Sequence, residues 1–128
     1  MKILYNKLKH VRENLRNGSA TVGSWMQLPD ASVAEIMGKA GYDWVAVDLE
    51  HGRFSQQILP DVFRALELGG TIPFARVARA ETTEIKKALD AGAMGIILPM
   101  IESGQQLEEA IKTALYPPKG TRGVGYCR

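Results

Sequence analysis

The stretch WVAVDLEHG (residues 44–52) places three ionisable side chains directly behind an apolar run. Three more runs of this kind occur, TVGSWMQL at 21–28, IPFARV at 72–77 and GIILPM at 95–100. Each is largely continuous in apolar residues rather than alternating, as expected of strands that are covered on both faces. The four runs are therefore predicted to be buried strands of one sheet.

Helical patterns separate the predicted strands. Apolar residues recur at helical spacing in four segments, which are 33–40, 58–66, 85–89 and 107–114. Asp30, Ser55 and Ser103 are expected to cap three of these helices, because their side chains can accept hydrogen bonds from free backbone N–H groups. Successive strands begin roughly 25 residues apart. The chain is thus predicted to be an α/β protein in which a β–α unit repeats four times around a parallel sheet.

Two architectures are compatible with four such units. A flavodoxin-like doubly wound sheet fits 128 residues, but it normally brings a fifth strand and helix. A (β/α)8 barrel of the TIM type needs about 250 residues, so this chain would supply its first half. The Pro/Gly-rich segment YPPKGTRGVGYCR (116–128) leads into no further strand, which favours a half-barrel and a truncated chain. We divide the chain into an N-terminal helix, 1–18, and a half-barrel, 19–128.

Composition sets limits on the class of function. The chain has 16 Lys and Arg residues against 14 Asp and Glu, a net charge of +2, and no block of like charge. This pattern does not indicate a nucleic-acid or membrane-binding surface. The single cysteine, Cys127, cannot form an internal disulfide, and Cys and His show no zinc-type spacing. No segment has the length and apolar character of a signal peptide or a membrane span, so a cytoplasmic location is expected.

Polar and aromatic side chains gather where the predicted strands end. The residues at these positions are Trp25, Gln27, Asp48, Glu50, His51 and Arg76. The carboxyl ends of parallel strands meet at one edge, where α/β proteins carry their functional sites. A histidine beside a carboxylate can act as a general base, and a nearby arginine can bind a carboxylate or a developing enolate oxygen. Charges are also common at solvated strand ends, so one charged residue there would indicate little. The convergence of a carboxylate, a histidine and an arginine is what indicates proton transfer next to a carbonyl.

Two other features leave alternatives open. Asp90 ends the third helical segment, where a negative charge opposes the helix dipole, so it is either functional or simply solvated. The glycine-rich GTRGVG (120–125), with Lys119 and Arg128 nearby, could cradle a phosphate in a flavodoxin-like binding module. It does not match a Walker loop, and a flexible loop with contacts to a substrate is an equal interpretation.

The ordered motifs resemble the HpcH/HpaI aldolase family over about residues 18–126. They are GSWMQLPDASVAEIMGKAGYDWVAVDLEHG, PFARV, IKKALDAGAMGIILPM and YPPKGTRGVG. The family includes 4-hydroxy-2-oxoheptanedioate aldolase and 2-keto-3-deoxy sugar acid aldolases. The resemblance implies a (β/α)8 barrel of the phosphoenolpyruvate/pyruvate superfamily. It also implies a class II lyase that uses a divalent metal (Mg, Mn or Co) to cleave small 2-keto-4-hydroxy acids reversibly into pyruvate and an aldehyde.

The resemblance also implies a set of site residues. His51 in DLEHG matches the histidine that handles the proton on the hydroxyl of the cleaved bond, and Asp90 in ALDAG matches the aspartate that pairs with it. Arg76 in ARV matches the arginine that binds the keto acid and stabilises its enolate. Asp48 matches the acidic residue ahead of the Glu-His pair, and these four are the expected catalytic residues. Trp25 matches an aromatic that lines the pocket, so it shares substrate binding with Arg76.

One part of the family pattern has no match in this sequence. The family's metal ligands, a glutamate and an aspartate, lie on strands five and six of the barrel, and neither Glu50 nor Glu102 matches their motif. We therefore assign no metal ligand and interpret the chain as half of an aldolase. The alternative is a non-catalytic half-barrel that binds or complements a partner chain. Open sheet edges and an exposed inner face predict a homo-oligomer. Candidates for that inner face are Val45, Val47, Phe74 and Ile96.

Overall fold

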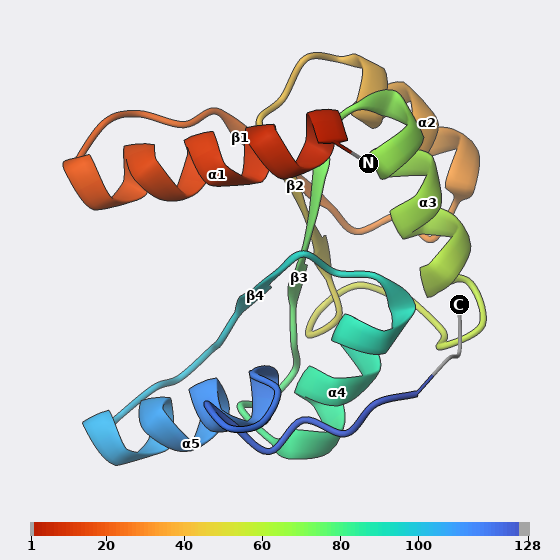
Figure 1. Cartoon of the computed structure of the whole chain (residues 1–128). Coiled ribbons are helices and arrows are strands. Elements are labelled where there is room, and N and C mark those ends of the chain that lie inside the picture. Colours follow the sequence, from red (N-terminus) through yellow and green to blue (C-terminus); the bar gives the residue numbers. More distant parts are fainter. Residues whose placement is uncertain (1, 126–128) are drawn as a thin grey trace.

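The computed structural model describes residues 2–125, with side chains from residue 4 onward, so Cys127 and Arg128 lie outside the described residues (Figure 1). The elements in chain order are α1 (Lys2–Asn17), β1 (Gly23–Met26), α2 (Ala31–Lys39), β2 (Trp44–Asp48), α3 (Leu59–Gly69), β3 (Ile72–Arg76), α4 (Thr82–Ala91), β4 (Gly95–Ile97) and α5 (Gly104–Ala114). After α1, a helix follows each strand, so the four predicted β–α units are confirmed. Among the described residues no helix has the length and apolar character needed to cross a membrane.

The four strands form one parallel sheet in the order β1-β2-β3-β4. Strands in chain order are typical of a (β/α) barrel, whereas a flavodoxin-like sheet places its first strand between the second and third. The predicted barrel order is therefore confirmed, and the flavodoxin-like alternative is wrong for the described part of the chain. The fold is that of a partial TIM-type barrel.

The hydrophobic core lies between the sheet and the helices α2, α3 and α4. Val45 and Val47 of β2 are both 0% exposed and belong to this core. Ile96 of β4 packs against it. All three had been predicted for the inner face of the half-barrel, and that prediction is wrong because their side chains point to the helix side of the strands. Phe74 precedes the core residue Ala75 along β3, so it points to the opposite face, as predicted.

Aromatic rings cover the face of the sheet that is turned away from the helices. The rings of Trp44 and Phe74 stack with their centroids 5.6 Å apart and their planes at 11°. Glycines on the neighbouring strands make room for them. A Cβ on Gly23 would lie 2.2 Å from the Trp44 ring, and one on Gly95 would lie 2.5 Å from the Phe74 ring. Any larger residue at these two positions would displace the stacked pair.

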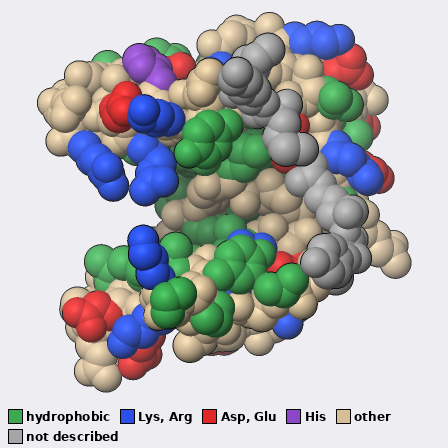
Figure 2. All heavy atoms as spheres, viewed as in Figure 1, with side chains coloured by type: hydrophobic (Ala, Val, Ile, Leu, Met, Phe, Trp, Pro, Cys, Tyr) green, Lys and Arg blue, Asp and Glu red, His purple; other side chains and the backbone are tan. Residues whose placement is uncertain are grey.

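The helix α1 lies across the end of the sheet where the strands begin. Lys7 Nζ donates to the carbonyl oxygens of Tyr42 at 2.7 Å and Gly70 at 3.0 Å, just ahead of β2 and β3. Val11 of α1 is buried. Figure 2 shows a hollow between α1 and the side of the molecule formed by α4 and α5, with hydrophobic side chains near it. The opposite end of the strands is left for the polar residues.

The predicted helix caps are partly confirmed. Asp30 Oδ1 accepts from the backbone N–H of Ser32 at 2.7 Å, and Ser103 Oγ accepts from that of Gln106 at 3.2 Å. Ser55 is not a cap, because α3 begins only at Leu59 with Ile58 ahead of it and a proline in its first turn. The loop after β2 is therefore longer than predicted, and this loop carries Glu50 and His51.

The helices α2 and α3 contact each other backbone to backbone. A Cβ on Gly69 of α3 would lie 2.5 Å from the carbonyl carbon of Gly38 in α2. A Cβ on Gly38 would in turn lie 3.1 Å from the carbonyl oxygen of Leu66. A side chain at Gly69 would push the helices apart, and one at Gly38 would require its neighbours to shift by a few tenths of an ångström. The two helices that cover β1 and β2 are therefore held at a fixed separation.

Candidate active site

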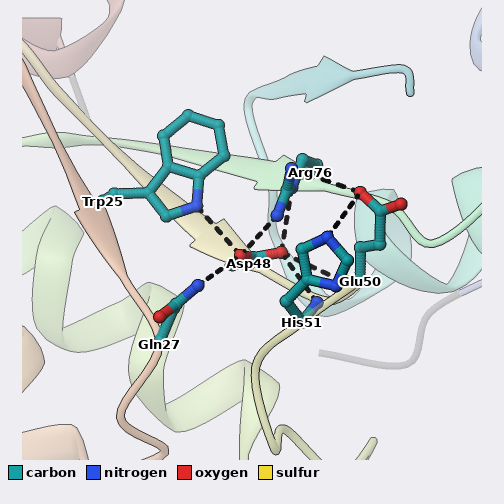
Figure 3. A network of polar contacts seen from close by, with 6 residues as sticks. All are labelled: Trp25, Gln27, Asp48, Glu50, His51 and Arg76. Carbon is teal, nitrogen blue, oxygen red and sulfur yellow. Dashed lines mark hydrogen bonds and ion pairs between the residues drawn. The ribbon is translucent and has the colours of Figure 1, made fainter. Parts of the chain in front are cut away.

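The carboxyl ends of β1, β2 and β3 bring six side chains together around Asp48 (Figure 3). We call this group the strand-end cluster; its members are Trp25, Gln27, Asp48, Glu50, His51 and Arg76. Asp48 is 0% exposed and its carboxylate accepts three hydrogen bonds on each oxygen. The donors to Oδ1 are Arg76 Nε at 2.9 Å and the backbone N–H groups of Glu50 and His51 at 3.1 Å each. The donors to Oδ2 are Arg76 Nη2 at 2.7 Å, Gln27 Nε2 at 2.9 Å and Trp25 Nε1 at 3.0 Å.

These contacts fix the charge of Asp48. Burial by itself would raise the pKa of this carboxyl group, but the hydrogen bonds outweigh burial, those from Arg76, Gln27 and Trp25 most strongly, and hold the pKa well below its usual range. A carboxylate offers about four lone-pair positions, and this one serves six donors. Asp48 is therefore a charged anchor for its neighbours and has no capacity left to accept a proton in catalysis.

Arg76 is held in one orientation by three neighbours. Its Nε and Nη2 bind Asp48 side-on, and its guanidinium carbon lies 5.1 Å from the centroid of the Trp25 ring, a cation–π contact. Its Nη1 lies 3.2 Å from Glu50 Oε2. The hydrogen bond to Asp48 raises the pKa of Arg76, so the charge is permanent. Of the five N–H groups of an arginine, Asp48 accepts the one on Nε and one on Nη2, so the second N–H of Nη2 and those of Nη1 make no hydrogen bond within the described residues. Two such donors side by side can bind a carboxylate or an enolate.

Glu50 and His51 leave β2 in a tight turn that Asp48 closes. The N–H of Gly52 donates to the carbonyl oxygen of Asp48 at 3.0 Å. The turn places Glu50 Oε2 3.8 Å from His51 Nε2. The His51 side chain is 64% exposed, whereas that of Glu50 is 22% exposed. The imidazole is thus accessible to an incoming molecule, and the carboxylate beside it is that of Glu50.

Asp90 does not join the strand-end cluster. It lies in the last turn of α4, where its Oδ1 accepts from Arg122 Nη2 at 3.1 Å. It lines a shallow surface recess with Gln56, Pro60 and Lys87, beside the loop that follows β2. The structure thus pairs Asp90 with Arg122, and its expected role as the partner of His51 stays a prediction.

The segment GTRGVG folds back on the end of α5. The guanidinium carbon of Arg122 lies 4.7 Å from the centroid of the Tyr116 ring. The backbone N–H groups of Thr121 and Arg122 donate to the carbonyl oxygens of Lys112 at 2.8 Å and Leu115 at 3.0 Å. We call Asp90, Tyr116 and Arg122 the α5 clasp. Because these N–H groups are already bonded within the chain, they are not available to cradle a phosphate.

Two cluster residues had no assigned role in the sequence. Gln27 lies two positions after Trp25, so both side chains leave β1 on the same side and reach Asp48 Oδ2. The spacing of two positions between Trp25 and Gln27 could therefore have predicted that Gln27 joins the site. Glu50 contacts both Arg76 and His51. Its position depends on the turn after β2, which no local sequence pattern predicts.

A divalent metal, which the family resemblance implies, does not fit the residues of this site. The two carboxylates are Asp48, whose lone pairs are all used, and Glu50, which lies against the positive charge of Arg76. Within the described part of the chain, no three His, Cys, Asp or Glu side chains are grouped so that they could hold a metal ion.

Comparisons with known proteins identify the family of the chain. The family model described as HpcH/HpaI aldolase/citrate lyase matches residues 21–126. The chain belongs to this family. A hydroxypyruvate/pyruvate aldolase of Roseobacter denitrificans is 39% identical over 119 residues, which are 93% of this chain and 46% of that protein. A 2-dehydro-3,6-dideoxy-6-sulfogluconate aldolase of Pseudomonas putida is 38% identical over 109 residues, or 85% of this chain and 43% of that protein.

Solved structures of HpcH/HpaI proteins show the same fold. A family protein from Burkholderia cenocepacia has a TM-score of 0.81 and 32% identity, covering 91% of this chain and 48% of its own. The citrate synthase SbnG has a TM-score of 0.79 and 34% identity, covering 88% of this chain and 46% of its own. The chain therefore spans less than half the length of these relatives.

Proposed function

We propose that this chain provides the keto-acid-binding half of a pyruvate aldolase, a carbon–carbon lyase that splits a 2-keto-4-hydroxy acid into pyruvate and an aldehyde. The observation that carries the proposal is the fixed guanidinium of Arg76. Asp48 and Trp25 lock it in place, and each of its terminal nitrogens keeps an N–H for a ligand. The exposed imidazole of His51 lies next to it across Glu50. The aldolase names of the relatives support the same class of substrate.

Each cluster residue has a task in this reaction. His51 accepts the proton of the hydroxyl group on C4, and the electrons of the C3–C4 bond then form the enolate of pyruvate as the aldehyde leaves. Arg76 binds the keto acid and stabilises the negative charge of the enolate. A proton from solvent then adds to C3 to give pyruvate, and His51 returns its proton to solvent as pyruvate leaves. Asp48 keeps Arg76 charged and oriented, and Trp25 covers the face of its guanidinium.

Exchange of the pyruvate methyl protons with deuterium oxide tests this function, because the exchange passes through the same enolate. We expect negligible exchange by the chain alone with added Mn²⁺ or Mg²⁺, since its cluster does not fit a metal. We expect rapid exchange once the C-terminal half of a family relative, with the two metal-binding carboxylates, is added. Proton NMR follows the loss of the methyl signal, and the Arg76→Ala chain with the same added half is the control. Brisk metal-dependent exchange by the chain alone would show that the ligand assignment is wrong.

A non-catalytic half-barrel that pairs with another chain is the second candidate function. In the described structure β1 and β4 each have one edge without a neighbouring strand. Such edges can pair with another chain, and Figure 2 shows hydrophobic side chains near the hollow between α1 and α5. Sedimentation of the chain tests this idea: we expect a dimer or larger species, and a stable, cooperatively folding monomer would contradict it. Homo-oligomeric assembly and a cytoplasmic location stay predictions.

A further inference from the structure

We infer that the Glu50 carboxylate forms an ion pair with Arg76 in the free protein and moves to His51 when the carboxylate of a ligand binds Arg76. The inference rests on the proposed function and names a device that controls ligand binding at the same site. It concerns a residue to which neither the motif nor the family resemblance assigns a role.

One oxygen of Glu50 lies between the two functional groups. Glu50 Oε2 is 3.2 Å from Arg76 Nη1 and 3.8 Å from His51 Nε2. The Glu50 and Arg76 side chains are each 22% exposed, so their attraction is less screened by solvent than that of a surface pair. A shift of this one carboxylate is therefore enough to exchange one contact for the other.

Asp48 cannot be the carboxylate that moves between Arg76 and His51. Its carboxylate already accepts six hydrogen bonds, two of them from backbone N–H groups that define the turn. Glu50, by contrast, makes no side-chain hydrogen bond or ion pair within residues 4–125 other than its ion pairs with Arg76 and His51. It is the carboxylate of the cluster that can move without dismantling the site.

A keto acid would meet Glu50 at Arg76. The ligand carboxylate needs an N–H on Nη1 and the remaining one on Nη2, which places it beside the negative charge already on Nη1. Like charges at such a separation repel, so Glu50 leaves Arg76. The nearest group that can become positive is His51. When a 2-keto-4-hydroxy acid is bound, His51 pairs with Glu50 as it accepts the proton of the C4 hydroxyl. When pyruvate alone is bound, no such hydroxyl is present and His51 takes up the proton from solvent.

Other charges near His51 do not replace this contact. Asp48 accepts the backbone N–H of His51, and Arg76 reaches the imidazole only through Glu50. Arg53 follows two positions later and is exposed. Ligand binding at Arg76 is thereby coupled to protonation of His51, with Glu50 as the link.

Pyruvate titration of the full chain tests the inference, with the ring signals of the two histidines followed by NMR. We expect the His51 signals to move toward those of the protonated ring. The signals of His10, which lies on α1 in contact with Asn14, should stay unchanged. Calorimetry in two buffers of different ionisation enthalpy should show net proton uptake. Glu50→Gln should bind pyruvate about tenfold more tightly, the size expected when one partly screened like charge is removed, and should lose the proton uptake.

Glu84→Gln is the matched control, because Glu84 is also a partly exposed carboxylate in an ion pair, with Lys87. Its affinity and proton uptake should equal those of the wild type. Amide spectra check that both variants are folded. Equal affinities for Glu50→Gln and Glu84→Gln, or His51 signals that ignore pyruvate, would overturn the role of Glu50 and leave the proposed function intact. Absence of pyruvate binding in both the wild type and Glu50→Gln would overturn the proposed function, and this inference with it.

Discussion

The strand-end cluster and the α5 clasp each combine a carboxylate, an arginine and an aromatic ring. The arginine lies over the ring in both, at 5.1 Å in the cluster and 4.7 Å in the clasp. Asp48 accepts two hydrogen bonds from its arginine and four from other donors, whereas Asp90 accepts one from Arg122. In the clasp the buried Nε of Arg122 has no partner among the described residues.

The strand-end cluster and the α5 clasp differ in which residue can still form hydrogen bonds. In the cluster the carboxylate is saturated, so the arginine keeps donors for a ligand beside an exposed imidazole. In the clasp the arginine holds the segment after α5 against the end of α4. The same three groups therefore make a binding site in one place and a fastening in the other.

The largest contrast is expected when each carboxylate is removed. Asp48→Ala should lower the free energy of unfolding by about 3–5 kcal/mol, because it leaves Arg76 and several donors without their shared partner. Asp90→Ala should cost less, about 1.5–3 kcal/mol, since it removes one hydrogen bond between charged groups. Urea denaturation of both variants measures these losses. Equal losses of unfolding free energy in the two variants would contradict the distinction between the strand-end cluster and the α5 clasp.

The two arginines should differ next in activity. In the complemented enzyme, Arg76→Ala and His51→Ala should each slow aldol cleavage by on the order of a hundredfold or more, as for loss of an oxyanion donor or a positioned base. Arg122→Ala should leave the rate within about threefold. The rate of pyruvate release under saturating substrate is the measurement. A comparable loss in Arg122→Ala would place the clasp in the active site.

Acid should weaken the strand-end cluster. The pKa of Asp48 is lowered on folding, so its contribution to stability is present above the unfolded pKa of about 4 and is lost as the pH falls below it. The slope from this one group is at most about 1.4 kcal/mol per pH unit. We expect Asp48→Asn to flatten the stability profile between pH 4 and 2, as read by urea unfolding. An unchanged slope in Asp48→Asn would contradict this expectation.

The smallest effect concerns the rings. Trp25→Phe keeps a ring over Arg76 but removes the indole N–H that donates to Asp48, so it should cost about 1 kcal/mol. Tyr116→Phe keeps the ring over Arg122 and removes no recorded bond, so it should cost less than about 0.5 kcal/mol. Thermal unfolding should resolve the two, with a shift of about 4 °C for the first. The reverse ranking would mean that the clasp depends on its ring more than the cluster does.

The sequence predicted the order of the sheet better than the direction of its side chains. The spacing of apolar runs was enough for four β–α units in barrel order. Val45, Val47 and Ile96 were placed on the wrong face, because a strand covered on both sides carries no alternation that marks inside from outside.

The site was predictable only where chain order and strand ends determine it. Asp48, Arg76 and Trp25 met because carboxyl ends of adjacent parallel strands meet at one edge. The contact of Asp90 with Arg122 joins residues 32 positions apart and has no local pattern in the sequence. The approach of Glu50 to His51 depends on a turn that the Asp48 side chain closes, so it follows from tertiary structure.

The backbone contact between Gly38 and Gly69 has a consequence for motion. No side chains lie between α2 and α3 at that point, so neither helix can slide by repacking rotamers, and separation requires the whole contact to open. Amide hydrogens of the two helices should then exchange with solvent deuterium as one cooperative unit, on the slow timescale of that opening. Faster fluctuations are expected at the β4 edge of the sheet, where a hydroxyl contact between Thr82 and Thr113 joins α5 to α4 and the bond between Asp90 and Arg122 joins α4 to the segment after α5.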